Sequence, residues 1–314
     1  MVAYLFAGQG SQYVGMGKDL YEAFPESKAV FDKADQILGF SLTQLCFEGP
    51  PEELKQTRNC QPAILTMSIA AWQAFRSVRS SPAKADPPAQ EKCEARTFAA
   101  GLSLGEYSAL VAAEALSFED AVYLVRKRAE FMEQEALKKP GRMLSIIGLD
   151  LETVKQICRE THAEIANLNC PGQIVISASP DNIEKAQDKA RQKSARMTIP
   201  LEVSGAFHSS FMRDASARLA TELEKIKFKA PRIPVVSNVT AKPPVSTEEI
   251  KDNLIQQVAS SVLWEDSMRF LLSEGVRNFF EFGPGNVLKG LMRRIEPQAK
   301  IVNIGKKEDV VNLW

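Results

Sequence analysis

The chain has 314 residues, of which 45% are hydrophobic and 25% are charged, as in a globular protein that buries a core without disulfides or metals. Lysine plus arginine and aspartate plus glutamate both number 39, so the net charge is zero. That balance argues against nucleic-acid binding and against attraction to an anionic membrane surface.

The cysteines and the apolar segments predict a cytoplasmic protein. No C-x-x-C pair occurs, so we expect reduced and mostly buried thiols. No signal-peptide pattern begins the chain, and no apolar run approaches the roughly 18 residues of a membrane span. The five cysteines are Cys46, Cys60, Cys93, Cys158 and Cys170.

Strands and helices alternate through the first part of the chain. Ser80–Arg96 is rich in proline, alanine and charge, and it is interpreted as a loop or a partly disordered surface insert. Ser117 with Asp120 three residues on is a capping-box pattern that begins a helix. Apolar spacing predicts strand Val2–Phe6, helices Leu20–Leu38 and Ala63–Val78, strand Thr97–Gly101, and helices Glu106–Ala113 and Ser117–Leu137.

Residues 140–200 follow a different pattern. Their order of strand, helix, strand, strand, helix, strand is that of a split βαβ, ferredoxin-like unit. The expected elements are strand Arg142–Leu149, helix Leu151–Thr161, strands Ala163–Asn169 and Gln173–Ala178, helix Pro180–Lys193 and strand Ala195–Leu201.

The last part of the chain returns to alternation. Patterns of this kind indicate an α/β fold whose mostly parallel sheet has helices on both faces. We predict a discontinuous large domain, 1–139 and 201–314, and a small inserted α+β domain, 140–200. The expected elements are strand Ile233–Ser237, helices Glu248–Ala259 and Trp264–Ser273, strand Asn278–Phe282, and a helix from Gly283-Pro284-Gly285 to about Arg294.

Gly101-Leu102-Ser103-Leu104-Gly105 matches the G-x-S-x-G motif of a serine nucleophile. A sharp strand-to-helix turn needs the two glycines, because a Cβ at either position would clash. The turn would expose the Ser103 hydroxyl at a helix N-terminus, where the Leu104 N–H is the natural oxyanion donor. The motif alone also fits a tight turn with an incidental serine, so the strand-turn-helix context carries this prediction.

A nucleophilic serine needs a base, and the chain has two histidines. His162 lies at the polar end of a predicted helix and is interpreted as a surface residue. His208 also fits a helix cap or a core position, but it is the only plausible base for Ser103. No carboxylate occupies an obvious third position, since Asp214 lies six residues on. A backbone carbonyl could orient the imidazole instead.

Several motifs together resemble the malonyl-CoA:acyl-carrier-protein transacylases and the related acyltransferase domains of polyketide synthases. The resemblance runs from about Val2 to Ile304 and implies an α/β-hydrolase-like large domain with a ferredoxin-like insert. The motifs are Phe6-Ala-Gly-Gln-Gly-Ser-Gln12, Gly101-Leu-Ser-Leu-Gly-Glu-Tyr107, Asn167-Leu-Asn-Cys-Pro-Gly-Gln173, Gly205-Ala-Phe-His208-Ser, Val262-Leu-Trp264 and Glu281-Phe-Gly-Pro-Gly285.

The resemblance also implies roles for single residues. Ser103 is the expected nucleophile and His208 the base. Gln12 and the Leu104 N–H would form the oxyanion hole. The backbone carbonyl of Gln257 would hold the histidine. The site would also be lined by Asn169.

Arg128 lies 25 residues after Ser103, where the resemblance implies a carboxylate-binding arginine. A guanidinium pairs two N–H groups with two carboxylate oxygens, which lysine cannot copy. Arg128 would therefore select an acyl group with a free carboxylate, because an acetyl group would leave a buried charge unpaired. Without the resemblance, Arg126, Lys127 and Arg128 are more simply interpreted as a solvated helix face.

The implied activity is ping-pong transfer of malonyl from malonyl-CoA to the phosphopantetheine thiol of an acyl carrier protein through a Ser103 acyl-enzyme. Coenzyme A is then a group carrier, and no metal or redox cofactor is expected. We expect a monomer with no nucleic-acid or membrane partner. The carrier belongs to fatty-acid or polyketide synthesis, and the pattern before His208 resembles malonyl-type more than methylmalonyl-type enzymes.

Two alternatives stay open. The family more often has histidine at position 102, whereas Leu102 also occurs in plant-type transacylases and in some polyketide-associated acyl hydrolases. An acyl hydrolase acting on carrier proteins would use Ser103 and His208 without needing Arg128. The other alternative is a non-catalytic docking module of a synthase complex, and the chain could be part of a longer polypeptide.

Overall fold

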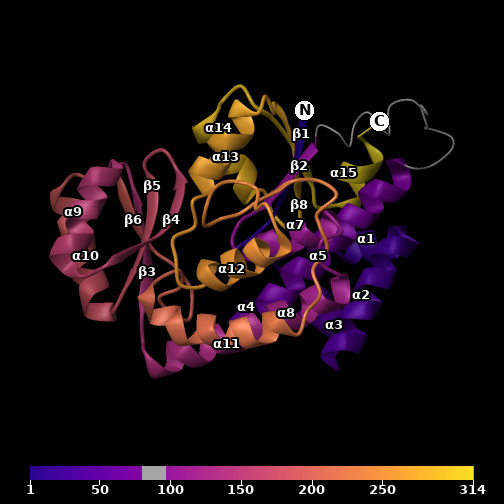
Figure 1. Cartoon of the computed structure of the whole chain (residues 1–314), viewed down its shortest axis with the longest axis horizontal. Coiled ribbons are helices and arrows are strands. Elements are labelled where there is room, and N and C mark those ends of the chain that lie inside the picture. The colour runs from indigo at the N-terminus through magenta and orange to yellow at the C-terminus, as the bar shows by residue number, and fades with distance from the viewer. Residues whose placement is uncertain (80–96, 314) are drawn as a thin grey trace.

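A computed structural model describes residues 1–79 and 97–313, within which the chain forms two β-sheets (Figure 1). The larger sheet is parallel, with the strand order β7-β2-β1-β8-β9. The direction of winding reverses between β1 and β8, and open parallel sheets bind ligands at the carboxyl ends beside such a point. The strands are β1 (Val2–Phe6), β2 (Thr97–Gly101), β7 (Val235–Val236), β8 (Asn278–Phe282) and β9 (Lys300–Ile304).

Helices surround the parallel sheet. Ser117 caps α8 as the sequence predicted, since its Oγ accepts a hydrogen bond from the Asp120 N–H at 3.0 Å. The helices are α1 (Lys18–Ala23), α2 (Pro25–Leu38), α3 (Leu42–Glu48), α4 (Pro51–Lys55), α5 (Thr57–Arg79), α7 (Gly105–Ala112), α8 (Phe118–Lys138), α11 (Arg213–Glu224), α12 (Thr247–Gln257), α13 (Trp264–Ser273), α14 (Val287–Ile295) and α15 (Lys307–Val311), with a 3₁₀ turn η2 (Ser210–Met212).

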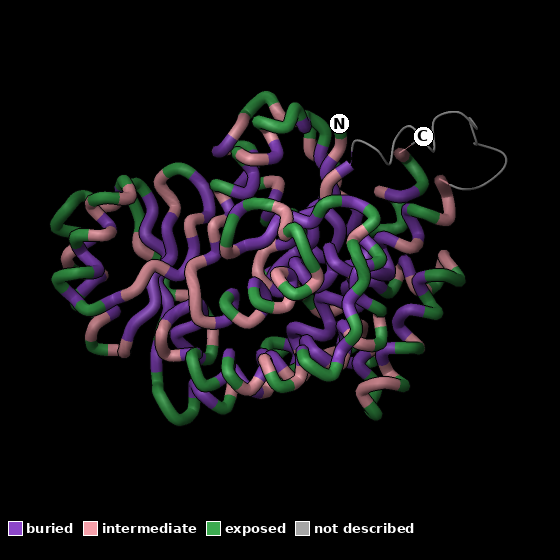
Figure 2. The backbone as a smooth tube through the Cα atoms, viewed as in Figure 1, coloured by how far each residue is buried: buried purple, intermediate pink, exposed green. Residues whose placement is uncertain are grey.

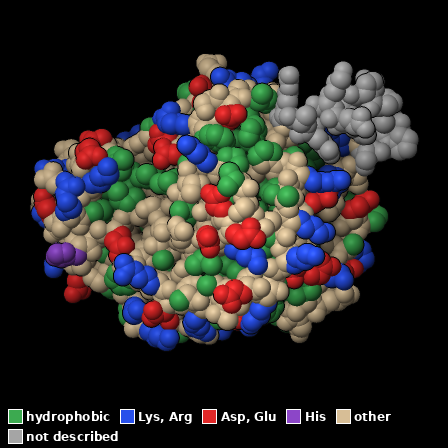
Figure 3. Space-filling view, in the orientation of Figure 1, with side chains coloured by type: hydrophobic (Ala, Val, Ile, Leu, Met, Phe, Trp, Pro, Cys, Tyr) green, Lys and Arg blue, Asp and Glu red, His purple; other side chains and the backbone are tan. Residues whose placement is uncertain are grey.

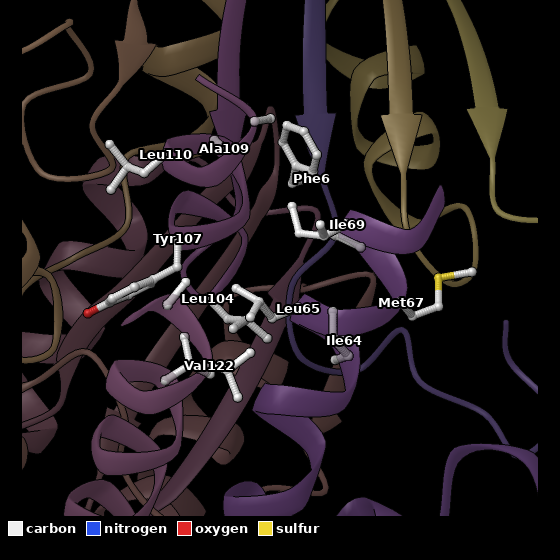
Figure 4. Close-up of a cluster of buried hydrophobic side chains, with 14 of the residues drawn as sticks. Phe6, Ile64, Leu65, Met67, Ile69, Leu104, Tyr107, Ala109, Leu110 and Val122 are labelled. Atoms are coloured by element: carbon white, nitrogen blue, oxygen red, sulfur yellow. The ribbon is translucent and has the colours of Figure 1, made fainter. Parts of the chain in front are cut away.

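Both faces of the parallel sheet are buried, because alternate residues of a strand point to opposite sides. Tyr4 and Phe6 of β1 belong to the cluster that includes α5, α7 and α8, part of which Figure 4 shows. Ala3 and Leu5 belong to the cluster formed with α13 and α14. In Figure 2 the buried backbone runs through these central strands. The sheet is thus a rigid platform whose strand ends can carry a site.

The smaller sheet is antiparallel, with the order β4-β5-β3-β6. Leu144 and Ile146 of β3 pack against its two helices, whereas Met143 faces the cluster of the larger sheet. The chain order of strand, helix, strand, strand, helix, strand is the predicted one. The elements are β3 (Arg142–Ile147), α9 (Leu151–Thr161), β4 (Glu164–Cys170), β5 (Gln173–Ala178), α10 (Pro180–Gln192) and β6 (Met197–Pro200).

Some elements differ from the prediction. Leu20–Leu38 is two helices, because Phe24 is extended and Pro25 begins α2. The strand expected at Ile233–Ser237 is reduced to two residues. Helices α3, α4 and α15 and strand β9 were not predicted, since short helices and a half-exposed edge strand have little hydrophobic pattern. Helix α11 was also missed, although its buried residues Ala215, Leu219 and Leu223 recur at helical spacing. The insert Ser80–Arg96, with Cys93, lies outside the described residues.

The remaining cysteines, Cys46, Cys60, Cys158 and Cys170, are free and buried as predicted. His162 is exposed at the C-terminal end of α9, as expected for a surface residue. Acidic and basic side chains are interspersed over the face shown in Figure 3, in keeping with the zero net charge. No helix within 1–79 and 97–313 has the length and apolar character to cross a membrane.

Candidate active site

Ser103 lies on the turn between β2 and α7, at the carboxyl edge of the parallel sheet. The turn is too tight for a side chain at either flanking glycine. A Cβ on Gly101 would lie 1.9 Å from the Gly105 carbonyl carbon, and one on Gly105 would lie 2.2 Å from the Phe6 oxygen. Ser103 itself has φ 50°, a left-handed conformation that L-residues rarely adopt. This is the strained strand-turn-helix that the motif predicted, and it holds the hydroxyl above the sheet.

The imidazole of His208 is hydrogen-bonded at both nitrogens. Nε2 lies 2.8 Å from Ser103 Oγ, and Nδ1 lies 2.8 Å from the backbone oxygen of Gln257. A carbonyl only accepts, so Nδ1 carries the proton and Nε2 is the acceptor that faces the serine. The structure therefore brings together all three residues in the predicted arrangement, with a carbonyl where other serine enzymes use a carboxylate.

His208 is 5% exposed, and its surroundings favour the neutral ring. Burial and, to a smaller extent, the nearby Arg128 cation together lower the pKa of His208 to about 4. The ring is then unprotonated at neutral pH, as a general base must be before it accepts the serine proton.

Arg128 projects from the middle of α8 into the site and is 1% exposed. Its Nη2 donates to Ser103 Oγ at 2.9 Å and to Gln257 Oε1 at 3.1 Å, while Nη1 donates to Gln61 Oε1 at 2.7 Å. All three acceptors are uncharged. Among the described residues no carboxylate lies within ion-pair distance of this guanidinium, and its Nε–H is buried without an acceptor. A buried cation beside the nucleophile is thus left able to bind an anion.

A buried network supports the turn from below. Asn238 Oδ1 accepts from the Ser103 N–H at 2.6 Å, and its Nδ2 donates to the Gly101 oxygen at 2.8 Å. Gln257 Nε2 donates to the Ser103 oxygen at 3.0 Å and to Glu106 Oε2 at 2.7 Å. Sequence reasoning missed Asn238 and Glu106. The sequence did contain a signal for Glu106, since this residue lies in the first turn of the helix that follows the nucleophile. A carboxylate is favoured there by the helix dipole.

Above these groups lies a cavity of about 430 Å³. The cavity is lined by Gln12, as well as by Ser103, Arg128 and His208. Leu104 and Gln257 are fully buried beneath it and do not line it. The other lining residues are Gln9, Gly10, Lys55, Gln61, Leu102, Met132, Met143, Asn167, Leu201, Glu202, Val203 and Phe207.

The predicted lining residue Asn169 is not at the cavity wall. The asparagine that lines it is Asn167, whereas Asn169 is not among the lining residues, although both side chains are buried to the same extent. The Oδ1 of Asn169 has no hydrogen-bond partner among the described residues. Strand β4 has irregular pairing on both sides of Leu168, so the sequence alone could not determine which asparagine faces the site. The expectation for Asn169 is corrected to Asn167.

The chain matches a family model described as an acyl transferase domain over residues 3–294. A malonyl CoA-acyl carrier protein transacylase of Bacillus subtilis is 45% identical over 98% of this chain and 95% of its own length. A polyketide biosynthesis malonyl CoA-acyl carrier protein transacylase of the same organism is 42% identical over 96% and 99%.

Two solved structures are similarly close. An acyl-carrier-protein S-malonyltransferase from Bartonella henselae superimposes with a TM-score of 0.92, at 36% identity and over 99% of this chain and 97% of that one. A malonyl-transacylase in complex with a type II polyketide synthase acyl-carrier protein superimposes with a TM-score of 0.91, at 36% identity and over 99% and 98%.

Proposed function

The chain belongs to the malonyl-CoA:acyl-carrier-protein transacylases of the acyl transferase family, and on that premise we propose that it transfers malonyl from malonyl-CoA to the phosphopantetheine thiol of an acyl carrier protein. One observation carries the substrate class. The buried guanidinium of Arg128, which no described carboxylate contacts directly, lies 2.9 Å from the nucleophilic oxygen. An acyl group with a terminal carboxylate supplies the direct anionic partner that this guanidinium lacks.

The first half-reaction makes the acyl-enzyme. Ser103 Oγ attacks the thioester carbonyl while its proton passes to His208 Nε2, to which it is already hydrogen-bonded at 2.8 Å. The tetrahedral intermediate collapses by breaking the C–S bond. The proton on Nε2 then goes to the leaving coenzyme A thiolate, and a malonyl ester of Ser103 is left.

The second half-reaction runs the same steps in reverse order. The phosphopantetheine thiol gives its proton to His208 Nε2 and attacks the ester, and the C–O bond breaks with return of that proton to Ser103 Oγ. The Gln257 carbonyl accepts from Nδ1–H in both halves, so it keeps the ring in one orientation and stabilises the transient positive charge of the imidazolium.

Gln12 and the Leu104 N–H are proposed to bind the oxyanion. Gln12 lines the cavity, and its Oε1 accepts from the Gly10 N–H at 2.8 Å, which leaves the amide NH₂ to face a ligand. Leu104 is the residue just before α7, where helix N–H groups favour developing negative charge. Asn167 takes over the lining role expected of Asn169.

The fold assignment can also be taken further. We infer that the antiparallel unit is ferredoxin-like, since it combines the strand-helix-strand-strand-helix-strand order with the sheet order β4-β5-β3-β6. The α/β-hydrolase-like character of the parallel unit rests on its nucleophile turn. The boundaries 1–139, 140–200 and 201–314 stay predictions.

The cofactor requirement, the location, the oligomeric state and the pathway of the protein stay predictions. The reaction needs no resident cofactor, since coenzyme A arrives with the substrate and leaves as product. The cytoplasmic location rests on the free cysteines, the monomeric state is an expectation, and the carrier can belong to fatty-acid or polyketide synthesis.

The proposal is tested with radiolabelled malonyl-CoA, with and without carrier protein. We expect a labelled Ser103 adduct by mass spectrometry and transfer of the label to the carrier. Rapid release of free malonate with little carrier labelling would identify an acyl hydrolase instead. The absence of any Ser103 adduct would identify a non-catalytic module.

Arg128→Ala tests the substrate class directly. We expect its kcat/KM for malonyl-CoA to fall on the order of a hundred- to a thousandfold, with a relative gain for acetyl-CoA, because the carboxylate loses the buried cation that pairs with it. Arg126→Ala is the matched control, since Arg126 lies on the same helix but binds Glu130 at the surface. An unchanged preference in Arg128→Ala would mean that this residue does not select the acyl group.

A further inference from the structure

Glu106 is a buried carboxylate that the transfer mechanism does not use. It lies in the first turn of α7, directly below the nucleophile turn, and is 4% exposed. Its Oε2 accepts from Gln257 Nε2 at 2.7 Å and from the Asn238 N–H at 3.0 Å. A buried carboxylate costs free energy unless it is hydrogen-bonded and near a positive charge, so the burial of Glu106 needs a structural explanation.

The amide of Gln257 connects this carboxylate to Arg128. Gln257 Oε1 accepts from Arg128 Nη2 at 3.1 Å, and Nε2 on the other side of the same amide donates to Glu106. Arginine has only donors and an ionised carboxylate has only acceptors. If the Gln257 amide were flipped, its NH₂ would face the N–H groups of Arg128 and its oxygen would face the carboxylate of Glu106. The two charges therefore determine the orientation of the amide.

We infer that Glu106 is the counter-charge and positioning residue of Arg128, acting through the side-chain amide of Gln257. This inference rests on the proposed function, because it concerns how the acyl-selecting cation is held. The amide dipole lies between the two charges with its oxygen toward the cation and its N–H toward the anion, so each charge is stabilised without direct contact.

An indirect pair has a consequence for the substrate. A carboxylate bound directly to the guanidinium would occupy the N–H groups that the malonyl carboxylate needs. With Gln257 between them, Glu106 stabilises the buried cation in the free enzyme, and the Arg128 Nε–H has no acceptor among the described residues.

Gln257 has a second role that couples the base to the same support. Its backbone oxygen accepts from His208 Nδ1 at 2.8 Å, while its side chain bonds Arg128 and Glu106. Glu106 therefore holds in place the residue that orients both the general base and the cation. Loss of its charge should disturb malonyl transfer more than transfer of an uncharged acyl group, which uses only the base.

The groups around Glu106 determine when it is charged. Burial raises the pKa of Glu106 to about 7, opposed by hydrogen bonds from Asn238 and Gln257, by the Arg128 cation and by the Ser237 hydroxyl. Among the described residues Arg128 is the cation that acts on Glu106, and His208 and Tyr107 are uncharged at neutral pH. The carboxylate form thus prevails above neutral pH, and Glu106→Gln copies the protonated form.

The experiment compares wild type with Glu106→Gln at about pH 8 and about pH 5.5, with malonyl-CoA and acetyl-CoA as donors. At the higher pH we expect the malonyl-to-acetyl ratio of kcat/KM to fall about tenfold in the variant. At the lower pH the two proteins should differ by less than about twofold, because wild-type Glu106 is then protonated.

Glu281→Gln is the matched control. Glu281 is a buried carboxylate at the end of β8 whose pKa is also raised by burial, and it accepts backbone N–H bonds from Leu288 and Lys289 without contacting Gln257. The malonyl-to-acetyl ratio of kcat/KM in Glu281→Gln should equal that of wild type at both pH values. An unchanged ratio in Glu106→Gln, or an equal loss in both variants, would overturn the inference.

A stability measurement separates this inference from the proposed function. Thermal midpoints are measured at about pH 8 for Glu106→Gln, Arg128→Met and the double variant. Each single change leaves one buried charge unmatched, so the double variant should lose less than the sum of the single losses. Additive losses would refute the pairing. If wild type labels no carrier but the losses are non-additive, the proposed function fails and the charge pair stands.

Discussion

The two reacting residues both sit on left-handed backbone. Ser103 has φ 50° and His208 has φ 56°, and neither is a glycine. Such residues cost on the order of 1–2 kcal/mol each, and they persist only where the surrounding structure enforces them. Here the enforcement is visible, since Asn238 holds the Ser103 N–H and Gln257 holds the His208 ring. Strain at these two residues is part of how Oγ and Nε2 are kept 2.8 Å apart.

His208 should make stability depend on pH. Its pKa is about 4 when folded and about 6.5 in an unfolded chain, so the unfolded state binds the proton more readily. The stabilisation is full above pH about 6.5 and is lost as pH falls toward about 4, for a total on the order of 3 kcal/mol.

Urea unfolding of wild type and His208→Gln at a series of pH values measures this contribution. The loss of unfolding free energy between neutral and acid pH should be smaller in the variant, because glutamine does not titrate. Parallel pH curves for the two proteins would show that the ring is not held neutral.

Arg128 shows that its position on the helix, rather than its charge, determines whether a residue of α8 is buried. It shares the buried side of α8 with Leu124, Val125 and Met132, three to four residues apart, although the simplest interpretation of the sequence placed it on a solvated face. Its neighbours Arg126 and Lys127 do lie there and pair with Glu130. The 3.6-residue period would have singled out Arg128, since it falls among apolar positions.

At the scale of elements, the contact of β2 with α7 depends on glycine. In Gly101→Ala the new Cβ would meet the Gly105 backbone at 1.9 Å, so the helix must move away from the strand. We expect a loss of about 3 kcal/mol or more in unfolding free energy and no Ser103 adduct with malonyl-CoA. Calorimetry and mass spectrometry measure the two effects.

Gly290→Ala is the control for that change. Gly290 lies in α14, and a Cβ there would meet nothing within 4 Å. Alanine should stabilise this helix by about 0.5–1 kcal/mol and leave the Ser103 adduct intact. Similar melting behaviour of the two variants would contradict the close packing of the nucleophile turn.

At the scale of the whole molecule, the two sheets share the task of holding His208. Gln257 reaches the ring from α12, beside the parallel sheet. Ser177 of β5, in the antiparallel sheet, donates its hydroxyl to the Phe207 oxygen at 2.7 Å, and Glu164 of β4 accepts from the Ser210 N–H at 2.9 Å. The base is therefore located by both sheets, and the cavity lies where they meet.

Ser177→Ala tests this shared support. Removing the hydroxyl leaves the buried Phe207 carbonyl without this donor, so we expect about 1–3 kcal/mol of destabilisation. The displaced base should lower kcat about tenfold with an unchanged malonyl-to-acetyl preference, because Arg128 is not touched. Steady-state kinetics with both donors measure the two parameters.

Ser145→Ala is the control on the same sheet. Ser145 is also buried, but its hydroxyl bonds no other described residue. Its removal should leave kcat as in wild type. If both serine variants had the same kcat, the Ser177 hydroxyl would have no part in positioning the base.

The sequence by itself determined what depends on local pattern. The order of the main strands and helices, the glycine-flanked serine, the pairing of one histidine with it and the family resemblance were all evident, because short-range propensity and motif spacing encode them. Strand β9, which has little hydrophobic pattern, was missed, and the helix break that Pro25 marks locally was overlooked.

Only the tertiary structure decided which groups meet. Ser103 and His208 are 105 residues apart in the chain, and the Gln257 amide bonds the Ser103 oxygen across 154 residues. Contacts over such separations depend on how whole elements pack, which no local window specifies. For that reason Glu106, Asn238 and Gln61 were not predicted, and Asn167 rather than Asn169 faces the cavity.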